Sequence, residues 1–123
     1  MANKKNDSEK IAENIVKGIQ EKKGYDIVKL DLRNIPNAVT DIFVICHGTS
    51  KPQLVSIFES IEETVKKNLG IDPWHKEGFQ NTEWILLDYV DVVVHIFQEN
   101  SRSFYKLEEL WADAEIEHIE DTQ

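Results

Sequence analysis

The chain has 123 residues, with 14 Lys and Arg, 23 Asp and Glu and a formal net charge of -9 at pH 7. This length suits one domain with a hydrophobic core and is too short for two. No apolar run approaches the roughly 20 residues that span a bilayer, and the polar N-terminus does not resemble a secretory signal. Because Cys46 is the only cysteine, an intramolecular disulfide and a cysteine-cluster metal site are excluded. We therefore expect a cytoplasmic protein with no membrane partner.

The acidity is concentrated in the second half of the chain. Residues 1–70 carry 11 Lys and Arg against 10 Asp and Glu, whereas residues 71–123 carry 3 against 13. Such a field repels phosphate backbones and attracts basic proteins, so direct nucleic-acid binding is not expected as the main activity. Part of the excess belongs to a predicted frayed, solvated tail from Asp113 to Asp121.

The first half of the chain predicts one helix and two strands. Residues 8–23 repeat Ile11, Ile15 and Ile19 at helical spacing, and Gly24 follows at the place of a C′ glycine. Residues 26–32 alternate as a half-buried strand does, with Val28, Leu30 and Leu32 on one face. After a loop at Pro36 and Asn37, the apolar run 42–46 predicts a central strand buried on both faces, with Cys46 as a small buried hydrophobe.

The second half predicts two more strands between two helices. Ser50 is a good N-cap, Gln53 a capping-box partner, and Gly70 ends that helix. A loop with Pro73 and Gly78 precedes two closely linked strands, 84–87 and 92–97. Ser101 is expected to cap a last helix that buries Phe104, Leu107, Leu110 and Trp111.

The element order is therefore α-β-β-α-β-β-α, which is typical of an α/β fold with a mixed β-sheet packed with helices. We expect a single domain over residues 1–123, with an ordered core at about 8–113 and an acidic tail at 114–123.

Spacing does not favour catalysis. The strand–Gly48-Thr49-Ser50–helix junction is similar to the turn of nucleotidyltransferases, but those enzymes need carboxylates at DxD spacing to hold Mg²⁺, and the chain has none. A residual metal-dependent nucleotidyltransferase or phosphohydrolase stays the alternative, while a helix cap is the preferred interpretation of the turn. The four histidines lack metal-ligand spacing, and GxSxG, P-loop and GxGxxG motifs are absent. We expect a protein that is not an enzyme, with no metal and no cofactor.

Binding is better supported than catalysis by the segment from Trp84 to Trp111. Strand alternation places Trp84, Leu86 and Asp88 on one face of the first strand, and Val93, His95 and Phe97 on one face of the second. Such a face is typical of a protein-recognition patch, because aromatic anchors carry much interface energy. A half-buried core in which His95 bonds to a neighbour fits the same pattern equally well.

The residues also resemble a known family. The stretches TDIFVICHGTSKPQ (40–53), Glu77-Gly78, WILLDYVDVVVHIF and RSFYKLEELW are similar to the ribosomal silencing factor, or Iojap-like, family over about residues 11–111. The resemblance implies a degenerate nucleotidyltransferase-like fold that has lost its catalytic carboxylates. It also implies a translational repressor that binds ribosomal protein fourteen of the large subunit and sterically blocks association of the ribosomal subunits, which lowers translation when nutrients are scarce. A homodimer is a further implied property, and a dimerising adaptor without a ribosomal role is a third interpretation.

Carried over residue by residue, the resemblance predicts a partner-binding set on the strand pair and the last helix. Its members are Trp84, Asp88, Tyr89, Asp91, His95, Phe97, Arg102, Tyr105 and Glu108. One departure concerns the turn, where Val90 stands in place of the family's glycine. Because valine resists positive φ, this turn must either adopt another conformation or carry strain.

Overall fold

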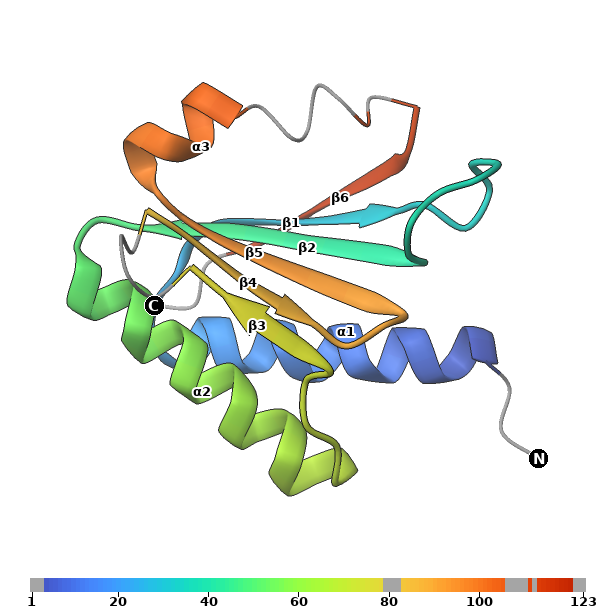
Figure 1. Ribbon diagram of the computed structural model, residues 1–123, viewed down its shortest axis with the longest axis horizontal. Helices are drawn as coiled ribbons and strands as arrows, with labels where there is room; N and C mark the ends of the chain where they lie inside the picture. The colour runs from blue at the N-terminus through green and yellow to red at the C-terminus, as the bar shows by residue number, and fades with distance from the viewer. Residues whose placement is uncertain (1–3, 79–82, 106–110, 112, 121–123) are drawn as a thin grey trace.

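The sheet is mixed and lies at the centre of the molecule. The computed structural model describes residues 4–78, 83–105, 111 and 113–120, with side chains from residue 7 onward except 103–105. In this part of the chain six strands pair in the order β3-β4-β5-β2-β1-β6. The elements are α1 (Lys4–Glu21), β1 (Tyr25–Asp31), β2 (Ile42–Gly48), α2 (Lys51–Leu69), β3 (His75–Glu77), β4 (Trp84–Asp88), β5 (Val92–Gln98), α3 (Glu99–Tyr105) and β6 (Glu115–Ile119). The predicted α/β class with a mixed sheet is confirmed (Figure 1).

The two central strands determine how the layers form. β2 and β5 run parallel to each other, and the remaining neighbours in the sheet are antiparallel. Every residue of β2 is buried, as predicted for a strand covered on both faces, and the Cys46 thiol lies inside it. Helices α2 and α3 each begin within a few residues of the end of one of these strands, so both start at the same edge of the sheet.

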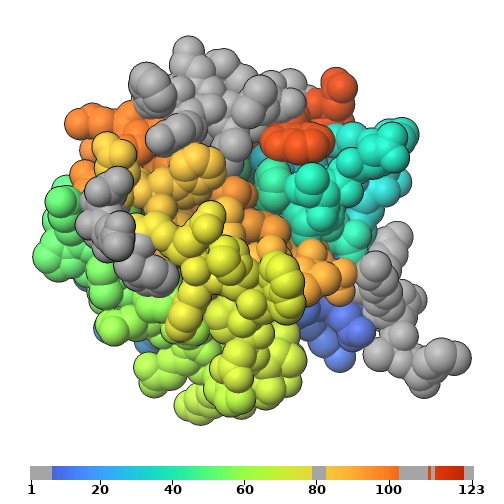
Figure 2. All heavy atoms as spheres, viewed as in Figure 1, coloured from blue at the N-terminus to red at the C-terminus, as the bar shows by residue number. Residues whose placement is uncertain are grey.

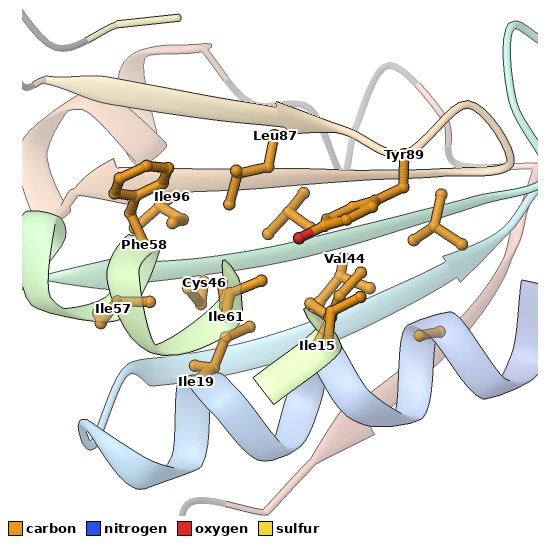
Figure 3. Packing of buried hydrophobic residues seen from close by; sticks show 14 of the residues in the cluster. Ile15, Ile19, Val44, Cys46, Ile57, Phe58, Ile61, Leu87, Tyr89 and Ile96 are labelled. Carbon is orange, nitrogen blue, oxygen red and sulfur yellow. The ribbon is translucent and has the colours of Figure 1, made fainter. Parts of the chain in front are cut away.

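Helices α1 and α2 cover one face of the sheet (Figures 1 and 3). Gly18 lets the two helices approach closely, because a Cβ there would lie 2.8 Å from the Cα of Ile61. The core between helices and sheet includes Ile15, Ile19, Val44, Cys46, Ile57, Ile61, Leu87 and Ile96. None of the helices in the described residues is long and apolar enough to cross a membrane.

A second core covers the opposite face. Val28, Leu30 and Leu32 share it, as the alternation predicted, with Phe43 and Phe97. Helix α3 lies on this side in Figure 1, and the rings of Trp111 and Phe43 pack nearly perpendicular, with their centroids 5.9 Å apart. The predicted burial of Phe104, Leu107 and Leu110 concerns side chains outside the described residues.

The helix ends agree with the sequence in part. The Ser50 side chain accepts a hydrogen bond from the Gln53 N–H at 3.2 Å, so the interpretation of this turn as a helix cap is confirmed, as is Gly70 as the left-handed end. Gln53 reaches the N–H of Thr49 at 2.8 Å, one residue earlier than a capping box requires.

Two predicted helix ends are wrong. At the end of α1, Lys23 adopts the left-handed conformation (φ 58°) and Gly24 follows it, donating its N–H to the Ile19 carbonyl. The two residues therefore occupy C′ and C″ of a Schellman motif, one position later than predicted for the glycine. Ser101 is not a cap, because α3 already begins at Glu99 and Ser101 is buried within it.

Two edge strands were not predicted, so the order α-β-β-α-β-β-α is incomplete. The expected loop contains β3, which pairs with β4. The expected frayed tail contains β6, which pairs with β1 from Ile27↔Ile119 to Asp31↔Glu115. Lys29, which bonds to Glu9 at 2.7 Å, lies 3.7 Å from Glu117 and links the edge strand to α1. The acidic residues of β6 are thus part of the sheet.

Candidate functional site

Three aromatic rings of the predicted recognition face stack against one another. The rings of Trp84 and Phe97 lie 4.9 Å apart, and the Trp84 indole N–H donates to Nδ1 of His95 at 3.0 Å. The His95 and Phe43 rings are nearly perpendicular, with their centroids 4.7 Å apart. Phe97 is completely buried and His95 is 5% exposed, while Trp84 is half-buried. The alternation of faces was predicted correctly, and both His95 and Phe97 are buried on this face.

The hydrogen bond from Trp84 determines the state of His95. An indole nitrogen only donates, so Nδ1 must carry a lone pair and the ring proton is on Nε2. Burial lowers the pKa of His95 to about 4, against the usual 6.5. In the described part of the chain Nε2 has no hydrogen-bond partner. His95 is therefore a neutral donor at the base of the aromatic stack.

The β4–β5 turn separates the remaining predicted residues. Tyr89 is buried against the helix layer, where Figure 3 shows its ring among Val44 and Ile15. Burial raises the pKa of its hydroxyl above the usual range, and nearby carboxylates raise it further. Asp91 uses its backbone carbonyl to accept the N–H groups of residues 41 and 42, and so fixes the turn to the start of β2. The Asp91 side chain itself is half-buried.

Val90 adopts the conformation that its glycine-like position requires. Its φ is 74°, and the N–H of Asp91 bonds to the carbonyl of Tyr89 at 2.9 Å across it. This arrangement is a γ-turn of the rare, strained kind. Of the two outcomes that the sequence allowed for a valine in this turn, another conformation or a strained one, the structure has the strained turn with positive φ. Asp88 supports it by accepting the Val90 N–H at 2.7 Å.

Replacing Val90 by glycine should therefore stabilise the protein by about 1 kcal/mol. A non-glycine residue held in the left-handed conformation costs the folded state about 1–3 kcal/mol, which glycine would avoid. Glycine also gives the unfolded chain more conformational freedom, which lowers this gain in stability by about 0.4–1 kcal/mol. Val90 is 59% exposed, so little burial is lost. Urea denaturation measures the effect. Val39→Gly is the matched control, because this exposed valine has no positive φ and should lose stability; a Val90→Gly protein that loses as much would contradict the strain.

The predicted residues of the last helix have different positions. Nη1 of the Arg102 guanidinium donates to the carbonyl of Asp26 at 2.6 Å and lies 3.1 Å from Nδ1 of His47. Arg102 therefore ties α3 to the start of β1. Tyr105 is the last residue of α3 and its side chain is not among those described, and Glu108 lies outside the described residues.

A groove of about 600 Å³ opens beside the aromatic stack. Its walls are Trp74 and Val39, each 75% exposed, and Val90. Its floor is formed by Phe43, Leu86, Val93 and His95, and Asp88 lies on its rim. Figure 2 shows on one face the three segments to which these wall residues belong. They are the loop before β2 (teal), the segment around β3 (yellow) and the β4–β5 turn (orange). We call this groove with its walls and rim the Trp74 groove.

Sequence reasoning missed Trp74 and Val39. Both lie in connecting segments, where no periodicity marks a side chain as exposed or buried. Trp74 is brought to the groove by β3, since its N–H donates to the Asp88 carbonyl at 2.7 Å next to the β3–β4 ladder. The one available signal was a tryptophan directly after Pro73 in a predicted loop, because tryptophan is enriched at protein interfaces.

The chemistry of the groove suits binding. Its described lining contains no Lys, Arg or Cys, and no group of three or more His, Cys, Asp or Glu in the described residues could hold a metal ion. Ser50, the candidate of the nucleotidyltransferase interpretation, is engaged as a helix cap. An exposed tryptophan in an apolar groove instead matches the aromatic enrichment of protein-recognition sites.

Comparison with known proteins identifies the family. A model of the family described as "Ribosomal silencing factor during starvation" matches residues 5–123. The ribosomal silencing factor of Bacillus subtilis (strain 168) is 41% identical over 100 residues, which cover 81% of this chain and 83% of that protein. A chloroplastic Iojap protein of Zea mays is 34% identical over 116 residues, covering 91% of this chain and 48% of that protein.

Solved structures agree with the fold. A crystal structure of a Chromobacterium violaceum protein has a TM-score of 0.79 at 29% identity and covers 85% of both chains. One from Bacillus halodurans has a TM-score of 0.74 at 31% identity and covers 91% of this chain and 98% of its own. The resemblance drawn from the sequence is thus confirmed: the chain belongs to the ribosomal silencing factor family.

Proposed function

We propose that this protein represses translation by binding ribosomal protein fourteen of the large subunit, where it sterically blocks association of the ribosomal subunits when nutrients are limiting. The observation that carries the proposal is the Trp74 groove, an exposed apolar surface beside a carboxylate in a member of the ribosomal silencing factor family. Blocking requires a stable surface contact and no chemical step. The proposed mechanism is therefore occupation of a surface.

The docking surface that we propose here adds Trp74 and Val39 to the face predicted from the sequence. Trp74, Val39 and Val90 protrude and supply the contact area, while Asp88 supplies charge. His95 is part of the floor, and its ring and that of Trp84 stack on Phe97, which supports the floor. A preorganised floor lowers the entropy that binding must overcome. Trp84 and the buried rings are thus proposed to act mainly by positioning the groove.

Charge favours a basic partner. Residues 71–123 hold 13 acidic residues against 3 basic ones. An acidic field of this kind speeds association with a basic ribosomal protein and is screened by salt. Binding to the large subunit should accordingly weaken as the salt concentration rises.

Trp74→Ser should weaken co-sedimentation with purified large subunits about tenfold or more. An exposed aromatic anchor at the centre of an interface contributes about 2 kcal/mol or more to binding, and Trp74 contributes little to the fold because it is three-quarters exposed. Ile116→Ser is the matched control, since Ile116 is an exposed apolar residue on the distant strand β6. Equal binding by both variants would remove the Trp74 groove from the interface, and no association of the unaltered protein at any salt concentration would refute the ribosomal role.

A homodimer, implied by the family resemblance, is a separate prediction. Sedimentation-velocity analysis of the free protein measures it directly.

A further inference from the structure

A tryptophan face and a carboxylate meet at the mouth of the Trp74 groove. The Trp74 N–H donates to the Asp88 carbonyl at 2.7 Å, so the two residues are held side by side by the backbone. The indole of Trp74 is 75% exposed. One oxygen of the Asp88 carboxylate accepts the Val90 N–H, and this is the carboxylate's single hydrogen bond in the described part of the chain. The carboxylate can therefore accept further hydrogen bonds.

No cation within the described residues balances Asp88. The groove lining contains no Lys or Arg. The two lysine or arginine residues nearest to Asp88 along the chain are engaged elsewhere. Lys76 pairs with Glu62 and lies over the ring of Phe58, and Arg102 donates to the carbonyl of Asp26. A half-buried carboxylate beside an apolar groove, with no counter-charge of its own, is complementary to a cation brought by a partner.

Only one kind of side chain uses all of these features together. A long aliphatic stem is needed to cover Val39 and Val90, a cation to pair with Asp88, and a planar group to stack on Trp74. The guanidinium of arginine stacks on aromatic faces and donates in a fixed fork to a carboxylate, whereas the ammonium of lysine is a compact, strongly hydrated charge. A purely apolar side chain would cover the walls but would leave Asp88 partly desolvated and unpaired.

We propose that the Trp74 groove receives one arginine side chain of a basic protein partner, with its stem against Val39 and Val90 and its guanidinium between Trp74 and Asp88. This inference deepens the proposed function and rests on it for the source of the arginine, which would be the ribosomal protein.

Capped tripeptides titrated into the full chain test the site without the ribosome. The central residue is arginine, citrulline (the same shape without the charge) or norleucine (the stem alone). The signal is the indole N–H resonance of Trp74, assigned by its disappearance in Trp74→Phe, with the indoles of Trp84 and Trp111 as internal references. The arginine peptide should shift the Trp74 signal, and the citrulline and norleucine peptides should bind about tenfold more weakly, because a charge-assisted hydrogen bond is lost.

Asp88→Asn should weaken the arginine peptide about tenfold as well, while leaving the two neutral peptides unchanged. The amide keeps an oxygen for the Val90 N–H, so the turn is preserved. Glu115→Gln on β6 removes the same charge far from the groove and should leave binding unchanged. Trp74→Leu tests whether the peptide needs the aromatic face of Trp74. Because this variant lacks the Trp74 indole, the methyl resonances of Val39 in the same groove serve as the signal.

Equal binding of the arginine and norleucine peptides would overturn the proposal, as would unchanged arginine binding by Asp88→Asn or no shift of Trp74 with any peptide. The proposed function fails separately. Arginine binding without co-sedimentation with large subunits would refute the ribosomal role and keep the arginine site. Co-sedimentation without arginine binding would refute the arginine site and keep the ribosomal role.

Discussion

Lowering the pH from 7 to 4 should remove about 3 kcal/mol from the free energy of unfolding through His95 alone. Burial lowers the pKa of His95 to about 4 in the folded protein, whereas the unfolded chain has the usual 6.5. Between these values the unfolded state binds a proton that the folded state does not, so stability rises with pH. The contribution of His95 is complete above pH 6.5 and is lost as the pH falls towards 4. Urea denaturation at a series of pH values measures it.

His95→Gln isolates this effect. The glutamine carbonyl can still accept from Trp84, but it does not titrate, so the variant should lack the loss of stability between pH 6.5 and 4. The pKa values of Glu9 and Asp31 are lowered by hydrogen bonds from Lys29 and Arg33, so the stability that these carboxylates contribute is lost as the pH falls below about 4.5. Their effect is common to both proteins. Parallel pH profiles for the original chain and His95→Gln would contradict a buried, neutral His95.

Gly78→Ala should destabilise the protein by about 3 kcal/mol. Gly78 has a φ of 101°, and a Cβ there would lie 2.0 Å from the Trp84 carbonyl oxygen and 3.0 Å from the Cα of Ile85. Left-handed strain costs about 1–3 kcal/mol, and the clash with backbone atoms, which cannot rotate away, adds an overpacking cost of similar size. The sheet can relieve the clash only by moving β3 away from β4, which would also displace Trp74 and weaken binding at the groove.

Gly70→Ala is the matched control for this prediction. Gly70 also has a positive φ, 72°, but nothing lies within 4 Å of a Cβ built there. It should therefore show the conformational cost alone, about 1 kcal/mol. Chemical denaturation compares the two variants. If Gly78→Ala loses no more stability than Gly70→Ala, the close approach of Gly78 to β4 is refuted.

The sequence predicted those parts of the fold that local chemistry determines. The helical repeat of Ile11, Ile15 and Ile19, the apolar run of β2 and the cap at Ser50 each depend on neighbours in the chain, and the structure has all three. The strands β3 and β6 were missed for the opposite reason. Their sequences, HKE and EIEHI, are short and mostly polar, and they become strands only because β4 and β1 offer them unpaired edges.

The candidate site was predicted only in part, because burial on the open face depends on tertiary packing. Alternation placed Trp84, His95 and Phe97 on one face correctly. It could not show that α3 and Trp111 lie over this face and that the rings bury one another. The exposed walls, Trp74 and Val39, come from two loops that meet only after β3 and β2 pair with the rest of the sheet.

The family resemblance and the structure agree on the backbone conformation at position 90. The glycine expected at this position signals positive φ, and the valine adopts it. The backbone shape of the turn is therefore retained against the preference of the side chain. A valine also adds an exposed apolar wall to the Trp74 groove, which glycine could not supply. The substitution Val90→Gly would thus relieve the backbone strain and would at the same time remove one apolar wall of the Trp74 groove.

The central claim, repression by blocking subunit association, is tested most directly by joining purified small and large ribosomal subunits in the presence of the protein. Sucrose-gradient centrifugation separates joined ribosomes from free subunits. The unaltered chain should lower the yield of joined ribosomes in proportion to the large subunits it occupies, and Trp74→Ser should leave the yield close to that without protein. Full joining of subunits while the chain stays bound to the large subunit would contradict the account.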